Sequence, residues 1–79
     1  MSLTIPVMIE LDQDATEVGA SATLELPTTQ FTAEARASVT RSASTPITDE
    51  LAIARVLRDL EVQIMRTVHE RIDRYVADE

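Results

Sequence analysis

The sequence predicts an α+β fold, in which a three-stranded antiparallel β-meander packs on one long C-terminal α-helix. In the first half of the chain, three stretches alternate apolar and polar side chains, as half-buried strands do. In the second half, apolar residues recur at steps of three and four, which is typical of an amphipathic helix. Because 79 residues make one domain at most, we expect a single domain over residues 1–79.

The first predicted strand, about residues 4–11, belongs at an edge of the sheet. Pro6 has no backbone N–H to donate, and proline is therefore tolerated mainly in edge strands. The apolar face of this strand consists of Ile5, Val7, Ile9 and Leu11. Residues 12–16 follow and are rich in turn formers.

The second and third predicted strands cover about residues 17–26 and 31–41. Their apolar faces are Val18, Ala20, Ala22, Leu24 and Leu26 in the second strand, and Phe31, Ala33, Ala35, Ala37 and Val39 in the third. Short connections favour antiparallel neighbours. A slip of one residue would turn every side chain to the other face, so the alternation specifies the register. An apolar sheet face needs a cover, which we expect the helix to supply.

The predicted helix spans about residues 46–77 and has two candidate starts. Thr45 followed by Pro46, or Thr48 followed by Asp49 and Glu50, offers N-cap and first-turn chemistry. The apolar stripe consists of Leu51, Ala54, Leu57, Leu60 or Glu61, Ile64, Val68, Ile72 and Tyr75. In the first half of the helix, Ile53, Val56, Leu57 and Leu60 widen this stripe.

The predicted helix is longer than the sheet that it covers. About 30 helical residues span roughly 45 Å, whereas strands of about ten residues span roughly 33 Å. Three apolar residues near the helix end, Ile72, Tyr75 and Val76, therefore lack an internal partner and are the candidate interface. We expect a homodimer or another homo-oligomer, formed through the helix end or a sheet edge. The alternatives are fraying of the helix end and a different protein partner.

The start of the helix resembles the signature of a family of small bacterial proteins of unknown function. The residues that carry the resemblance are Pro46-Ile47-Thr48-Asp49-Glu50-Leu51-Ala52-Ile53-Ala54-Arg55-Val56-Leu57-Arg58-Asp59-Leu60. The order of three strands and then this helix matches as well. The resemblance implies a fold similar to the double-stranded-RNA-binding domain without its first helix. It implies no activity, so no functional residue is carried over.

Duplex-RNA binding is the alternative function that this fold resemblance suggests. Such binding requires a basic cluster at a helix N-terminus. The predicted helix instead starts with Asp49 and Glu50, and the chain carries a net charge of −7, which repels phosphate backbones. Charge therefore counts against a nucleic-acid partner.

Two groups of residues resemble metal or catalytic sites. Asp12, Asp14 and Glu17 are spaced as calcium ligands can be, but Glu17 stands where a calcium loop needs glycine. We interpret them as a solvated hairpin turn. His69 is the only histidine, and a single histidine cannot assemble a zinc site, so we expect it on an exposed helix flank.

The polar face of the sheet carries Glu17, Glu25, Glu34 and Arg36. Paired carboxylates can perform acid–base chemistry only where shelter shifts their pKa values, and this face offers none. A glycine-rich phosphate loop is excluded because Gly19 is the only glycine. We therefore predict no enzyme, with no catalytic, cofactor or metal site.

The remaining composition favours a protein of the cytoplasm. The chain has no cysteine, and we see neither a signal peptide nor an apolar run long enough for a membrane span. We expect a small, non-catalytic soluble protein that acts by self-association or protein–protein interaction, without membrane contact.

Overall fold

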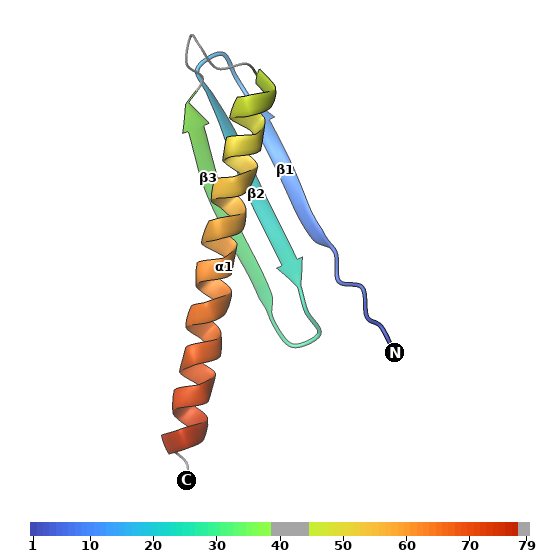
Figure 1. The fold of residues 1–79 in the computed structure, drawn as a ribbon, viewed down its shortest axis with the longest axis vertical. Helices are drawn as coiled ribbons and strands as arrows, with labels where there is room; N and C mark the ends of the chain where they lie inside the picture. Colours follow the sequence, from blue (N-terminus) through green and yellow to red (C-terminus); the bar gives the residue numbers. More distant parts are fainter. Residues whose placement is uncertain (39–44, 78–79) are drawn as a thin grey trace.

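The computed structural model describes residues 1–38 and 45–77 and contains four elements (Figure 1). The strands are β1 (Val7–Gln13), β2 (Glu17–Glu25) and β3 (Gln30–Ser38), and the helix is α1 (Thr45–Ala77). The sheet has the order β1-β2-β3, and both neighbouring pairs are antiparallel. The predicted α+β meander with a long C-terminal helix is therefore confirmed.

The strand bounds differ from the predicted ones mainly in β1. It begins at Val7, after Pro6, and continues to Gln13. Proline thus precedes the ladder, and β1 is an edge strand as predicted. β3 ends at Ser38, and the predicted end of that strand at residues 39–41 lies outside the described residues.

The register keeps the predicted apolar residues on one face of the sheet. Ile9 of β1 lies opposite Ala22 of β2, and Ala22 lies opposite Ala33 of β3. Two short turns connect the strands, and in the second one the Leu26 N–H donates to the Thr29 carbonyl at 2.8 Å. The alternation of side chains therefore specified the pairing correctly.

The core lies between α1 and the sheet and is built largely from small side chains. Its buried apolar residues are Val18, Ala20, Ala22, Phe31, Ala33, Ala37, Ala52, Val56 and Leu60. Alanine supplies five of these nine residues. Because alanine occupies little volume, the helix backbone can approach the sheet closely and bury each alanine almost completely.

The stripe of α1 that faces the sheet is the predicted one only in part. The helix buries Val56 and Leu60, as predicted, together with Ala52, whereas Leu51, Ala54 and Leu57 are exposed. The buried residues follow steps of four, and the small side chain of Ala52 fits against the alanines of the strands. Leu51 and Leu57, unlike the buried Leu60, lie on other sides of the helix because each residue turns the helix by about 100°.

The helix begins at Thr45, so the second of the two predicted starts is wrong. Thr48 lies in the first turn and is buried at 1% exposure, rather than capping the helix from outside. Asp49 and Glu50 consequently belong to the second turn, and the first turn contains no acidic residue.

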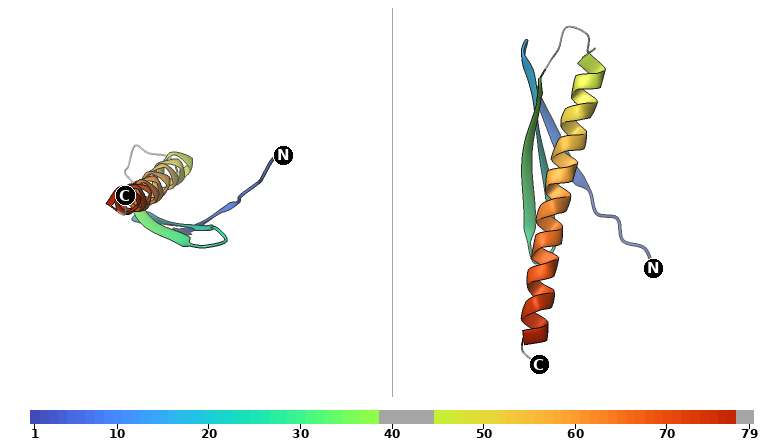
Figure 2. Two further views of the ribbon diagram at one scale, coloured as in Figure 1. Left: turned by 90° about the horizontal axis from the view of Figure 1, so that it is seen from below. Right: turned by 60° about the vertical axis from the view of Figure 1, so that its left-hand side comes forward.

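Two side-chain contacts show how α1 crosses the sheet. Near its start, the Gln13 Nε2 group donates to both carboxylate oxygens of Asp49 at 2.8 Å, which places this turn beside the end of β1. Further along, the Arg55 guanidinium donates to the Arg36 carbonyl of β3 at 2.8 Å. The helix therefore runs diagonally from β1 towards β3 and continues past the end of the sheet (Figures 1 and 2).

The overhang of α1 confirms the predicted mismatch of lengths. The helix has 33 residues, and the longest strands have nine. Every residue from Val68 to Val76 is exposed. The molecule measures 56 × 28 × 17 Å, with a radius of gyration of 16.2 Å. A compact domain of the same length has a radius of gyration of about 12 Å.

Candidate interaction face

The helix leaves β1 uncovered, which corrects the prediction that it covers the apolar face of the sheet. α1 packs against β3 and β2, and its bonds to β1 come from Gln13 at the end of that strand. A helix is about 10–12 Å wide, and three strands spaced about 4.8 Å apart are wider than that once their side chains are included. One helix that crosses towards β3 therefore covers two strands and leaves the third open.

The uncovered apolar side chains of β1 and of one flank of α1 make up a surface that we call the open face. Its strand part is Val7, Ile9 and Leu11, and its helix part is Ile53, Leu57, Ile64, Val68, Ile72 and Tyr75. The strand residues share the side of the sheet on which α1 lies, because Val7, Ile9 and Leu11 lie opposite Leu24, Ala22 and Ala20. Of these nine residues, Ile53 and Ile64 are half-buried and the others are exposed.

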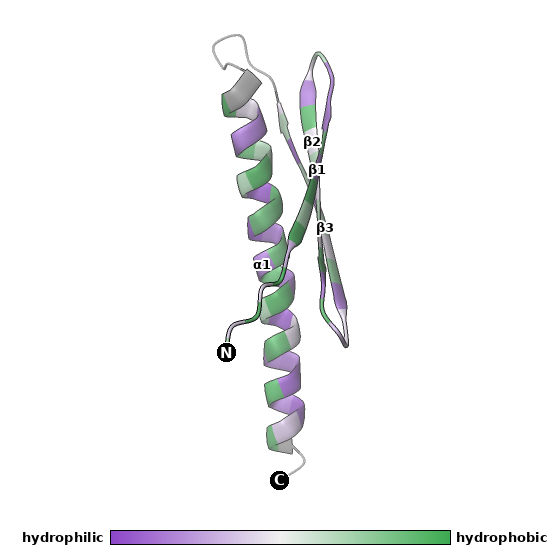
Figure 3. Ribbon diagram, turned by 90° about the vertical axis from the view of Figure 1, so that its right-hand side faces the viewer, coloured by the Kyte–Doolittle hydropathy of each residue, from purple (hydrophilic) through white to green (hydrophobic). Residues whose placement is uncertain are grey.

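Helical spacing places the helix part of the open face on the flank directed towards β1. Asp49 contacts β1, and Ile53 and Leu57 follow it at steps of four along the same flank. Ile64 and Val68 continue that flank at steps of seven and four. In the view from the β1 side, hydrophobic residues recur along α1 and also occur in β1 (Figure 3).

The three residues predicted as an interface are all strongly exposed. The exposed fractions are 52% for Ile72, 73% for Tyr75 and 63% for Val76. Ile72 and Tyr75 belong to the open face, whereas Val76 lies at its outer margin because each residue turns the helix by about 100°. None of the three contacts the sheet, which ends before this part of the helix (Figure 2).

The strand part of the open face was missed at the level of sequence. Val7, Ile9 and Leu11 alternate as core residues do, and this alternation predicts that they lie on the covered face. The size of these side chains is the signal that could have separated them. The opposing strands place alanines under the helix, whereas β1 carries larger side chains where no helix lies above them.

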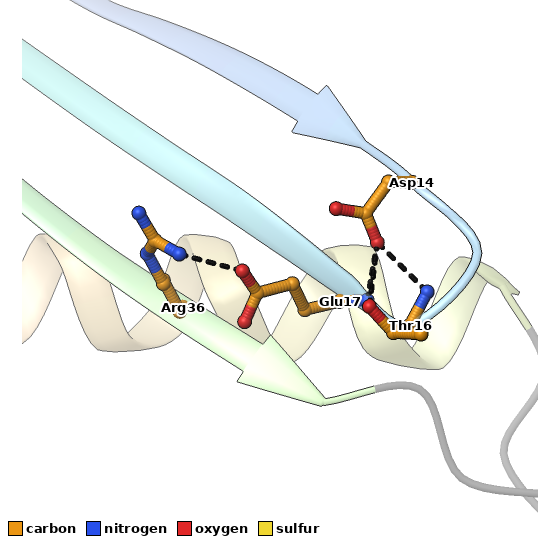
Figure 4. Close-up of polar contacts among 4 residues, drawn as sticks. All are labelled: Asp14, Thr16, Glu17 and Arg36. Atoms are coloured by element: carbon orange, nitrogen blue, oxygen red, sulfur yellow. Dashed lines mark hydrogen bonds and ion pairs between the residues drawn. The ribbon is translucent and has the colours of Figure 1, made fainter.

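A hairpin turn lies between β1 and β2, as predicted, and of the three acidic residues only Asp14 lies in it (Figure 4). Asp12 belongs to β1, and Glu17 is the first residue of β2. One Asp14 carboxylate oxygen accepts hydrogen bonds from the Thr16 N–H at 2.7 Å, the Glu17 N–H at 2.8 Å and the Thr16 hydroxyl at 3.0 Å. The backbone bonds from Thr16 and Glu17 lower the pKa of Asp14 from its ordinary value of 3.8. The Asp14 carboxylate therefore stabilises the turn by accepting these hydrogen bonds, a role typical of aspartate.

The polar face of the sheet bears an ion pair and an open hollow. The Arg36 guanidinium lies 2.5 Å from the Glu17 carboxylate, and both side chains are accessible to solvent (Figure 4). A depression of about 270 Å³ lies over Gly19, with Asp12, Glu34 and Arg36 among its lining residues. It is open to solvent, so it gives these carboxylates little shelter for acid–base chemistry.

Two further candidate sites from the sequence are His69 and the acidic residues near the start of α1. His69 is exposed on α1, as expected. In the described residues, no group of three or more histidine, cysteine, aspartate or glutamate side chains is arranged to hold a metal ion. The second turn of α1 carries Asp49 and Glu50 where duplex-RNA binding needs basic residues. Local charge therefore counts against duplex-RNA binding, which stays a prediction.

The fold and its open face define a small α+β protein whose main candidate for function is an exposed apolar surface rather than a pocket. A family model described as Rv2632c-like matches residues 3–79, and the chain therefore belongs to the Rv2632c-like family. This description assigns no activity to the family. No curated protein matches the chain. The helix found within the described residues lacks the run of apolar residues needed to cross a membrane.

Proposed function

We propose that the protein is a non-catalytic interaction protein that acts by associating with protein, in the first place with itself, through the open face. One observation supports this proposal above the others. Apolar side chains from β1 and from the flank of α1 that bears Asp49 remain exposed on the side of the sheet where α1 lies. Hydrophobic residues recur along both elements (Figure 3). Contiguous apolar surface rimmed by polar residues is typical of protein-binding sites.

The polar face of the sheet supports the non-catalytic part of the proposal. Its carboxylates lie on an open surface, and the hollow over Gly19 is shallow enough to remain solvated. The Asp14 carboxylate is engaged by the turn that it stabilises. Within the described residues, the polar side chains are thus arranged for solvation and turn formation rather than around a sheltered reacting group.

Adjacent residues of β1 provide a matched pair of variants to test the proposal. Ile9 lies on the open face, and Met8 lies on the polar face of the same strand, where it is 65% exposed. Ile9→Asp introduces a charge that association would have to desolvate, whereas Met8→Asp adds the same charge to a solvated surface. Light scattering on a size-exclusion column, over micromolar to millimolar concentration, measures the mass of each form.

We expect the native chain and Met8→Asp to have at least twice the monomer mass at high concentration, and Ile9→Asp to remain a monomer. Circular dichroism checks that all three are folded. A native chain that is monomeric over the whole range, or an Ile9→Asp variant that associates as the native chain does, contradicts the proposal.

A further inference from the structure

The open face has two exposed parts, one on a strand and one on a helix. β1 offers an apolar strip without a helix above it, and the end of α1 offers a helix without a sheet beneath it. The two parts cannot meet within one chain, because α1 leaves β1 near Asp49 and runs towards β3 (Figures 1 and 2). The strand part therefore lacks a covering helix, and the end of α1 lacks a strand to pack on.

We propose that the occupant of the open face is the overhanging end of α1 from a second copy of this chain, residues 68–76. This inference rests on the proposed function and specifies its partner and geometry. In a two-fold dimer, each helix end enters the wedge between α1 and β1 of the other copy. The same surface is then used on both copies, as in the interfaces of most dimers.

The dimensions of the two parts agree. The strip from Val7 to Leu11 spans about 13 Å at 3.3 Å per residue. The overhang from Val68 to Val76 spans about 12 Å at 1.5 Å per residue, so it fits within the length of the strip. The wedge is bordered by Leu57 and Ile64 on its helix side, which would contact the flank of the entering helix.

The surface area of the chain also agrees with a second copy as occupant. Its accessible surface is 6398 Å². A compact monomer of this mass exposes about 4,700 Å², so each copy exposes roughly 1,700 Å² more than compactness requires. A stable interface of ordinary size buries about 800 Å² on each partner. Burial of the open face and the overhang supplies that area from surface that a compact monomer would not expose.

Charge favours this arrangement over packing of sheet against sheet. The strand region, residues 1–38, contains six acidic side chains and the single base Arg36. The last part of the helix, residues 61–76, balances three acids with Arg66, Arg71 and Arg74. A neutral helix end placed against an acidic strand region avoids the repulsion that two acidic sheets would experience.

The absence of cysteine permits a direct test by disulfide cross-linking. Two single variants of the full-length chain, Ile9→Cys and Ile72→Cys, are prepared separately, and one of them is isotopically labelled. The two variants are then mixed and oxidised. A mixed disulfide can form only between copies, and mass spectrometry identifies it. The control replaces Ile9→Cys by Met8→Cys, because Met8 lies on the other face of the strand.

We expect the mixed disulfide between positions 9 and 72 to exceed the control product at least tenfold. A dimer that cross-links only between the two copies of position 9 indicates pairing of β1 edges. That result overturns the proposed geometry and leaves the proposed function standing. A monomer without any cross-link overturns both.

Discussion

The two sides of α1 carry similar apolar patterns and have opposite environments. Towards β2 and β3, small residues such as Ala52 meet the alanines of the sheet and are almost fully buried. Towards β1, larger residues such as Ile53 and Leu57 lie on the flank beside an uncovered strand and are half-buried or exposed. Burial of apolar area is the main favourable term in folding. The difference indicates that the first side stabilises the chain itself and the second is available for association.

The largest contrast between the two sides is expected from placing a charge on each. Val56→Asp puts a carboxylate at a position with 0% exposure, where no partner is available. We expect a loss of more than about 4 kcal/mol, which removes most of the stability of a domain of this size. Urea unfolding followed by circular dichroism measures it.

The control for this variant is Val62→Asp, at an exposed position of the same helix. Valine and aspartate have similar helix propensities, so we expect a change within about 0.5 kcal/mol. An equal loss for both variants would mean that the core described between α1 and the sheet is wrong.

A second contrast uses two alanines of α1 that differ in burial. Ala52 is buried against the sheet, and Ala54 is exposed. Ala52→Leu must displace the helix from the alanine-rich strands, with an expected loss of about 1–3 kcal/mol. Ala54→Leu is expected to change stability by less than about 0.5 kcal/mol. The same urea titration distinguishes them, and a stable Ala52→Leu variant would show that the helix lies further from the sheet than described.

A third prediction concerns how β1 is held, since it lacks a helix above it. Gly19 faces Asp12 of β1 across the ladder, and a Cβ atom there would meet the Asp12 carbonyl oxygen at 3.8 Å, an ordinary contact. Its φ angle is not positive, so alanine can adopt the same backbone. Gly19→Ala is expected to raise stability by about 0.5–1 kcal/mol, because glycine weakens strand interiors. A decrease in the urea midpoint would contradict this.

The smallest effect is expected at the β1–β2 turn and depends on pH. The backbone bonds that lower the pKa of Asp14 stabilise the folded chain while the carboxylate is ionised. This contribution is present above the ordinary pKa of 3.8 and is lost as pH falls through the lower pKa of the folded state. Asp14→Ala should therefore be destabilised relative to the native chain at pH 6, and the difference should shrink below pH 3.

The control at this turn is Asp14→Asn, which keeps an oxygen acceptor for the same N–H groups. This variant is therefore expected to lose less stability than Asp14→Ala at pH 6. Thermal unfolding of the three forms at both pH values tests the turn. A difference between native and Asp14→Ala that is independent of pH would mean that the charge of Asp14 plays no part.

The sequence predicted the fold because each element has a clear period. Alternation in the strands and the uninterrupted run after Pro46 were sufficient for order, register and overhang. The packed side of α1 was predicted only in part because the helix has apolar residues on more than one side. Leu51 and Leu57 contribute to the apolar pattern, whereas the buried side consists of Ala52, Val56 and Leu60. Periodicity alone does not report which of two neighbouring apolar stripes faces the sheet.

For the candidate interface, the sequence analysis named the helix end and a sheet edge, but not the apolar face of β1. Ile72 and Tyr75 follow from the excess of helix length over strand length, which is a local property of the sequence. The contribution of Val7, Ile9 and Leu11 depends on the diagonal path of α1. That path is set by contacts such as Arg55 with the Arg36 carbonyl, between residues far apart in the chain.

The most direct test of the account uses Tyr75, the single tyrosine of a chain without tryptophan. Its fluorescence reports on the helix end alone, where the side chain is 73% exposed in the isolated copy. Quenching of this fluorescence by acrylamide is measured from low micromolar to millimolar protein. If a second copy covers the helix end, the quenching constant falls at least twofold as concentration rises, and Ile9→Asp abolishes this fall. A quenching constant that stays at the value of free tyrosine over the whole range would contradict the account.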